Sequence, residues 1–178
     1  MEYGEDYWQE FQRRDETDTG AALTAARIEF VRRHHDGTLV DIGVGGGRFV
    51  REAGCVGYDI NPLAVDWLRD RGSYSDPYSA DVQAVTCWDS LEHMPDPKAL
   101  LRNVTDWLFA SIPVASSREA WLDSPHYKPG EHIWFWSTFG FVSWCWRWGF
   151  DVVEISDIEV KLGRRDIKTF AFRRFKNG

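Results

Sequence analysis

Cysteine is scarce in this chain, which has three among its 178 residues, Cys55, Cys87 and Cys145. They lie far apart in apolar surroundings, and no CxxC pair or Cys/His ligand spacing is present. This pattern excludes a disulfide framework and a zinc-finger-like site. We expect three buried, reduced thiols.

Long apolar runs and a basic leader are also missing. No stretch of about 18 uncharged apolar residues occurs, which is the length needed to cross a bilayer. Residues 1–18 are rich in Glu, Asp and Gln, whereas a secretory signal combines a basic start with an apolar stretch. We expect no membrane partner and a cytoplasmic location.

Positive charge is in deficit, because 21 Lys and Arg face 28 Asp and Glu, for a net charge of −7. Binding to a phosphate backbone requires clustered cations that release counterions, so a nucleic-acid partner is disfavoured. The basic side chains near the C-terminus are interpreted as a solvated edge hairpin. They are Lys161, Arg164, Arg165, Lys168, Arg173, Arg174 and Lys176.

Hydrophobic periodicity alternates between strands and helices after two helices that precede residue 37. Strands are expected at residues 38–42, 55–60, 82–89 and 107–112, and helices at 48–53, 62–71 and 96–105. Such alternation indicates a parallel sheet with helical crossovers. Residues 149–160 and 167–175 are both β-rich and are joined by a charged turn. The prediction is an α/β, Rossmann-like, doubly wound, mostly parallel sheet with a C-terminal antiparallel strand pair and a shortened third strand.

No internal repeat or low-complexity linker divides the chain, so we expect one domain over residues 1–178. Residues 1–36 would form an N-terminal helical cap. Residues 115–148 would supply a substrate loop and a tryptophan-rich helix, since long connections inside compact domains often bind substrate.

The most informative segment is a glycine-rich loop between a predicted strand and helix, with Gly43, Gly45 and Gly47 at alternate positions. Glycine permits positive φ and lets a ligand approach the backbone. A dinucleotide-binding G-x-G-x-x-G would require glycine where Arg48 stands, and a phosphate-binding P-loop would require a Gly-Lys pair, which the chain lacks. Asp41 precedes the loop; its carboxylate would repel a pyrophosphate but can bind the ammonium group of a zwitterion.

A second acid, Asp59, follows the next strand 18 residues later, with Ile60 beside it. An acid about 20 residues after a glycine loop commonly accepts hydrogen bonds from ribose hydroxyls. The alternative is that Asp59 caps the helix that begins near Pro62. Combined with the glycine loop, ribose binding is favoured.

At Asp41, the three loop glycines and Asp59, the chain resembles class I S-adenosylmethionine-dependent methyltransferases. Residues 81–97 are also similar to the Leu-Glu-His pattern of the subgroup that includes ubiquinone-pathway O-methyltransferases. The resemblance implies S-adenosylmethionine as cofactor, bordered also by Trp88, Asp89 and Ser90. One departure is the short interval 72–81, which leaves little room for the third strand and its adenine-contacting acid.

His132 and His126 are the candidate general bases, because imidazole titrates near neutrality. Each could instead be a surface or capping residue. Asp89, Glu92 and His93 resemble a cation-binding set in some relatives of the subgroup, but Glu92 and His93 could equally hydrogen-bond backbone at a helix start. We therefore assign no metal.

Tryptophan is unusually frequent, with ten residues in the chain. Half of them fall in one segment: Trp134, Trp136, Trp144, Trp146 and Trp148. Aromatic rings could line a substrate pocket, but an apolar helix is more often core or the contact of a homodimer.

The function predicted from the sequence is transfer of a methyl group from S-adenosylmethionine to a small or medium-sized acceptor. The alternative is a non-catalytic binding or interaction module of the same fold. A nucleic-acid methyltransferase is less favoured, because Asp89-Ser90-Leu91-Glu92 stands where base-methylating enzymes carry an Asn/Asp-Pro-Pro-aromatic motif.

Overall fold

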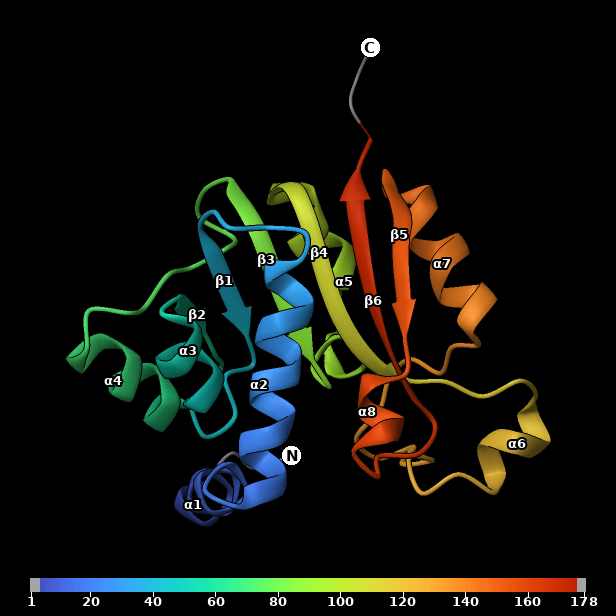
Figure 1. Ribbon diagram of the computed structural model, residues 1–178, viewed down its shortest axis with the longest axis horizontal. Helices are drawn as coiled ribbons and strands as arrows, with labels where there is room; N and C mark the ends of the chain where they lie inside the picture. The colour runs from blue at the N-terminus through green and yellow to red at the C-terminus, as the bar shows by residue number, and fades with distance from the viewer. Residues whose placement is uncertain (1–3, 176–178) are drawn as a thin grey trace.

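A computed structural model describes residues 4–175 as a six-stranded sheet with helices on both faces (Figure 1). The strands are β1 (Leu39–Ile42), β2 (Val56–Tyr58), β3 (Val82–Trp88), β4 (Val104–Pro113), β5 (Phe150–Ser156) and β6 (Ile167–Arg174). The helices are α1 (Glu5–Asp15), α2 (Asp18–Arg32), α3 (Arg48–Ala53), α4 (Pro62–Asp70), α5 (Pro97–Asn103), α6 (Arg118–Leu122), α7 (Thr138–Arg147) and α8 (Ile158–Lys161), with a 3-10 turn η1 (Leu91–His93). Lys176 of the basic segment lies outside the described residues.

The strand order is β2-β1-β3-β4-β6-β5, in which β6 runs antiparallel to both of its neighbours and the other pairs are parallel. This confirms the predicted Rossmann-like sheet and its C-terminal antiparallel pair. The third strand is reduced to one bridge between Gly57 and Tyr74, supported by hydrogen bonds from Gly57 N to Ser73 O (2.8 Å) and from Ser75 N to Gly57 O (3.0 Å). The predicted shortening is therefore confirmed.

Two apolar layers sandwich the sheet. On one face, Phe30 and Val31 of α2 pack with Phe109 of β4, and α2 lies in front of the sheet in Figure 1. On the other face, Leu100 of α5 and Phe141 of α7 join the core, and both are fully buried. Burial of such side chains stabilises the fold by about 2 kcal/mol each before entropy is counted.

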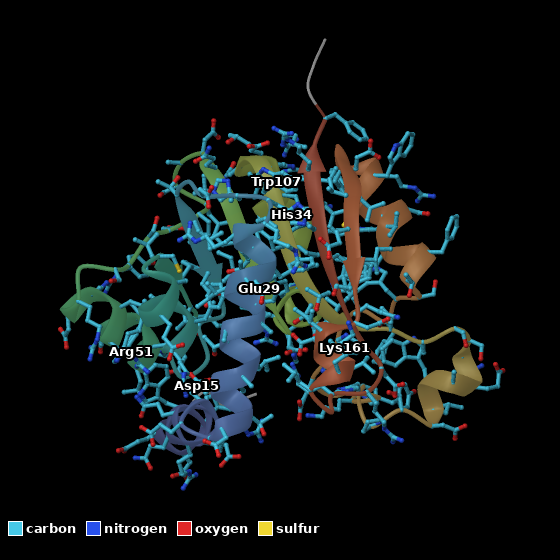
Figure 2. All side chains as sticks on the ribbon, in the orientation of Figure 1. Asp15, Glu29, His34, Arg51, Trp107 and Lys161 are labelled. Carbon is cyan, nitrogen blue, oxygen red and sulfur yellow. The ribbon has the colours of Figure 1, made fainter. Side chains whose placement is uncertain are left out.

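His34 follows α2 and closes the α2 face at the amino end of the parallel strands. Figure 2 labels His34 close to Trp107 of β4; their ring centroids are 5.4 Å apart, and His34 Nε2 lies 2.7 Å from Glu154 Oε2. The polar and aromatic contacts together fix α2 against β4 and β5.

The predicted β-rich run over residues 149–160 extends too far toward the C-terminus. The strand stops at Ser156, and residues 158–161 form the short helix α8 with Glu159 fully buried. The predicted edge hairpin is present as β5 and β6, with β5 as the outer strand, and Lys161 and Arg165 are exposed, but the other face of β6 is buried. The physical reason is its apolar face, where Phe170 and Phe172 are fully buried.

Helix α5 ends earlier than predicted, and β4 begins at once at Val104, which is fully buried. Helix α7 buries Phe141 and Cys145 but leaves Phe139 81% and Trp146 59% exposed. The tryptophan-rich segment is thus partly core and partly surface. Within residues 4–175, no helix combines the length and apolar character that crossing a membrane requires.

The N-terminus of α2 depends on a side-chain cap, since Thr17 Oγ1 accepts a hydrogen bond from Gly20 N at 3.0 Å. We expect Thr17→Ala to lower the free energy of unfolding by about 1 kcal/mol. Thr17→Ser keeps the hydroxyl and should stay within about 0.3 kcal/mol of the native chain. Urea unfolding measures both, and equal losses for the two variants would contradict the capping role.

Candidate functional site

The glycine-rich loop joins β1 to α3 and turns on three residues with left-handed φ, Gly43 (+78°), Gly45 (+56°) and Gly47 (+84°). A side chain rarely adopts this conformation. Neighbouring atoms also exclude one, because an added Cβ would lie 2.8 Å from Ser90 Cβ at Gly43 and 2.5 Å from the Trp67 ring at Gly47. Only glycine allows β3 and α4 to approach the loop this closely.

Asp41 lies at the end of β1 with 1% exposure, and its Oδ1 accepts a hydrogen bond from Thr86 Oγ1 of β3 at 2.6 Å. Burial raises the pKa of Asp41 to about 7, although the Thr86 hydrogen bond opposes this shift. A buried acid that titrates near neutrality is characteristic of functional sites. A cationic group reaching Asp41 would stabilise its ionised form.

Asp59 follows β2 and connects the glycine loop to the loop before α4 through hydrogen bonds to both. Its Oδ2 accepts from Val44 N at 2.9 Å and its Oδ1 from Asn61 N at 2.8 Å. Asn61, rather than Asp59, caps α4 by accepting from Leu63 N at 3.1 Å. Burial raises the pKa of Asp59, against the lowering effect of the two amide donors.

Ile60 is 64% exposed directly beside this carboxylate. A large apolar side chain that is exposed at the carboxyl end of a parallel strand can pack against the face of a ligand ring. The predicted pair Asp59 and Ile60 is therefore adjacent to the glycine loop.

The end of β3 and the turn after it contain buried polar atoms that have no hydrogen-bond partner among residues 4–175: Trp88 Nε1, Asp89 Oδ1 and Ser90 Oγ. Asp89 also adopts a left-handed φ of +52°, which is strained for a residue with a side chain. Unsatisfied buried groups are rare in native proteins and mark places where a ligand or an ion completes the bonding.

The other oxygen of Asp89, Oδ2, is held by two cations, Arg27 of α2 at 3.1 Å and Arg164 at 2.8 Å. Both arginines also bind the buried Glu159 of α8, at 2.8 and 2.5 Å. Although burial opposes it, Arg164 and Arg27 hold the pKa of Asp89 below its usual range. Arg164 of the supposedly solvated basic segment is thus part of an internal ion network.

Helix α1 covers the glycine loop from below the sheet, near the α1–α2 junction where Figure 2 labels Asp15. Asp15 Oδ2 accepts a hydrogen bond from Arg48 N, the first residue of α3, at 3.1 Å. A Cβ at Gly46 would collide with Asp15 and Phe11. The N-terminal helix therefore forms one wall of the site.

The two predicted bases lie in different surroundings. His126 bonds through Nε2 to the backbone oxygen of Arg165 at 3.0 Å. His132 is buried, and its Nδ1 has no hydrogen-bond partner among the described residues. Burial, helped by the neighbouring His93, lowers the pKa of His132 to about 4, so its imidazole is neutral at physiological pH.

A hollow of about 390 Å³ lies in the segment after β4, where the substrate loop was predicted. Its lining includes Trp121, Tyr127 and Phe135, and the Phe135 ring lies 6.2 Å from that of His132. A second hollow of about 370 Å³ lies between α3 and α4, around Arg51 and Trp67, away from both acids. The first hollow has the aromatic walls expected of an acceptor site.

Sequence comparison identifies a methyltransferase domain over residues 12–155. The chain belongs to the methyltransferase domain family. This match confirms S-adenosylmethionine as the cofactor. No curated protein matches the chain in sequence.

Three solved structures illustrate how the methyltransferase fold is shared. A putative methyltransferase from Haloferax volcanii, solved with the Trm112 methyltransferase activator, has a TM-score of 0.71 at 14% identity and covers 97% of this chain and 98% of its own. A possible histamine N-methyltransferase from Thermotoga maritima gives 0.66 at 14% identity, covering 97% and 99%. Magnesium protoporphyrin IX methyltransferase from Synechocystis, with bound SAH, gives 0.64 at 13% identity, covering 96% and 94%. At these identities the likeness establishes the fold alone.

The residues present fit the methyltransferase cofactor. The loop from Gly43 to Gly47 carries a single side chain, that of Val44, and Ser90 Oγ beside Gly43 is a buried hydroxyl without a hydrogen-bond partner among the described residues. Asp41 and Asp59 flank this loop, and carboxylate oxygens can accept hydrogen bonds from an ammonium group or from hydroxyls. The adenine side differs from the predicted family pattern, because Tyr74 and Tyr78 pack around Tyr58 where a full third strand would end.

Sequence reasoning missed the arginines that bind Asp89 and the nearness of His132 to Glu92. Arg27 precedes Asp89 by 62 residues and Arg164 follows it by 75. No local pattern marks such pairs, because tertiary folding alone brings them together. Only the ion pair between Glu159 and Arg164 could have been suspected from the sequence, because these two residues are five positions apart across a short helix.

Proposed function

We propose that this protein transfers a methyl group from S-adenosylmethionine to a small or medium-sized acceptor. Asp41 would bind the ammonium group of the cofactor, and Gly43, Gly45 and Gly47 would lie against its methionine portion. Asp59 would bind the ribose and Ile60 the adenine, with Trp88, Asp89 and Ser90 along the opposite side. The single observation that carries the proposal is the left-handed glycine loop flanked by the buried Asp41 and the half-buried Asp59.

The acceptor would enter the aromatic hollow of residues 115–137. In-line methyl transfer requires no covalent enzyme intermediate, and alignment of the two reactants supplies much of the rate. A base at His132 or His126 would assist an acceptor that must lose a proton. The sequence leaves open whether oxygen, nitrogen or carbon is methylated, and the Leu-Glu-His segment makes an oxygen acceptor the first to test, because it resembles that of ubiquinone-pathway O-methyltransferases.

Three further predictions complete the proposal. The acidic net charge makes a nucleic-acid acceptor unfavourable. Exposed Phe139 and Trp146 of α7 would form the contact of a homodimer. The protein would act in the cytoplasm.

Calorimetry with S-adenosylhomocysteine tests the cofactor site. We expect micromolar binding by the native chain and at least about tenfold weaker binding by Asp59→Asn, since a hydrogen bond to a charged group contributes about 1.5–3 kcal/mol. Asp66→Asn is the matched control, because Asp66 is exposed on the adjacent helix α4 and should leave the affinity unchanged.

Absence of binding to the native chain would contradict the proposal. Tight binding without formation of S-adenosylhomocysteine from S-adenosylmethionine on any small acceptor would instead favour the interaction module.

A further inference from the structure

The turn η1 and the segment after Lys128 bring together three side chains that the cofactor site does not use: Glu92, His93 and His132. Each offers one ligand atom, and these atoms lie within 4.8 Å of one another. We propose that these three residues bind one divalent transition-metal ion at the acceptor side of the methyltransferase site.

The first observation that supports a metal site is that buried ligand atoms of Glu92 and His132 have no hydrogen-bond partners among the described residues. Glu92 is 1% exposed, and neither carboxylate oxygen accepts a hydrogen bond from another described residue. His132 is 7% exposed, and its Nδ1 is likewise without a partner. Burying a carboxylate and an imidazole nitrogen without partners is costly unless a ligand completes them. Two unpartnered groups from separate segments point into the same place.

The second support is the orientation of His93. Its Nδ1 lies 3.0 Å from the carbonyl oxygen of Glu131, which accepts the Nδ1 proton and leaves the Nε2 lone pair free. Metal-binding histidines commonly donate their other ring proton to a carbonyl or carboxylate in this way. The rings of His93 and His132 meet edge to face with centroids 4.6 Å apart.

The third support is the rigidity of the backbone around the cluster. Ile133 N and Trp134 N both donate to the carbonyl oxygen of Glu92, at 2.9 and 3.2 Å. Trp134 Nε1 donates to the carbonyl oxygen of Met94 at 2.8 Å. These bonds hold the segment that carries His132 against the turn that carries Glu92 and His93, so the three ligands are positioned before any ion binds.

This set differs from the acidic set that the sequence suggested, because Asp89 is not in the cluster, and its Oδ2 binds Arg27 and Arg164. His132 takes its place, and while it binds the ion it would not act as the general base. Two imidazoles and one carboxylate suit first-row transition ions such as Mn²⁺, Co²⁺ or Zn²⁺ and leave coordination positions open. Mg²⁺ and Ca²⁺ prefer oxygen ligands throughout, so they fit this set poorly.

The location gives the ion a role in recognition. Ser90, two residues before Glu92, contacts the glycine loop at Gly43, and Phe135 beside His132 lines the aromatic hollow. The ion would therefore lie between the cofactor loop and the hollow. Its open positions would accept an oxygen of the acceptor, whose pKa a bound divalent ion lowers.

The test uses the full chain without a polyhistidine tag, treated with a chelator and titrated with Co²⁺ alone. We expect one equivalent to bind and to give visible absorption bands of an N/O-ligated ion. Glu92→Gln and His132→Gln should each bind Co²⁺ at least about tenfold more weakly, since even second-shell changes weaken metal sites by 10- to 100-fold. His126→Gln is the matched control, because His126 lies in the same segment outside the cluster and should bind Co²⁺ like the native chain.

Glu92→Gln preserves shape, and circular dichroism with S-adenosylhomocysteine calorimetry establishes that each variant remains folded. If the native chain binds no Co²⁺, or if folded Glu92→Gln and His132→Gln bind it as tightly as His126→Gln, the proposed site is wrong. Retained S-adenosylhomocysteine binding in either case separates this failure from a failure of the proposed function.

Discussion

Replacement of Asp41 by asparagine is expected to stabilise the fold at pH 8 while weakening S-adenosylhomocysteine binding by at least about tenfold. Asparagine has nearly the same shape, and its side-chain oxygen can still accept the hydrogen bond from Thr86 Oγ1. It lacks the negative charge that burial disfavours and that the cofactor ammonium group would require. Stability and binding should therefore change in opposite directions.

The sign of the stability effect follows from the pKa of Asp41, which burial raises from 3.8 to about 7. Between these values the folded chain retains a proton that the unfolded chain has released, so the free energy of unfolding falls as pH rises. The upper bound of this loss is about 4 kcal/mol, at 1.36 kcal/mol for each pH unit. Asp41→Asn abolishes it, so the variant should gain most above pH 7 and nothing near pH 4.

Thermal unfolding of both proteins at pH 4 and pH 8, without ligand, measures the effect. Equal stability of the native chain and Asp41→Asn at pH 8 would contradict the burial of an ionised Asp41. Unchanged ligand affinity in Asp41→Asn would show that the carboxylate does not contact the cofactor.

Gly47→Ala is expected to lower the free energy of unfolding by about 3 kcal/mol, combining a left-handed backbone with overpacking. Gly47 has φ +84°, and a Cβ there would lie 2.5 Å from the Trp67 ring. Trp67 packs against Trp8 of α1, with ring centroids 6.0 Å apart, so it cannot move without disturbing that helix. The variant should therefore lose cofactor affinity as well.

Gly54→Ala is the matched control, because Gly54 has φ +65° but no atom within 4 Å of an added Cβ. It should lose only about 1 kcal/mol, the cost of the left-handed conformation. Urea unfolding of the two variants separates conformation from collision. A loss at Gly47 no larger than that at Gly54 would mean that the packing of α4 against the loop is not close.

The sheet could be predicted from the sequence because its signals are local. Each parallel strand is a short apolar run, and Pro62 and Pro97 begin helices at the first helical position. The glycine loop and the two acids were equally visible, since their spacing along β1 and β2 fixes their positions in the fold.

The features that the sequence analysis did not predict depend on tertiary contacts. Residues 158–161 alternate apolar and charged side chains as a half-buried strand does, but they form a helix in which the buried Glu159 pairs with Arg27 and Arg164. The role of Arg164 within the basic C-terminal segment was hidden, because no local feature shows that it binds Asp89 and Glu159. The grouping of His132 with Glu92 was hidden for the same reason, because backbone hydrogen bonds across 40 residues of sequence create it.

The central claim is that the glycine-rich loop holds the cofactor, and an amide NMR titration with S-adenosylhomocysteine tests it most directly. We predict that the amide signals of Gly43, Gly45, Gly47 and Ile60 shift, while that of Gly149, which precedes β5 at the opposite end of the sheet, does not. Shifts confined to the hollow between α3 and α4, or no shifts at all at saturating ligand, would contradict the account.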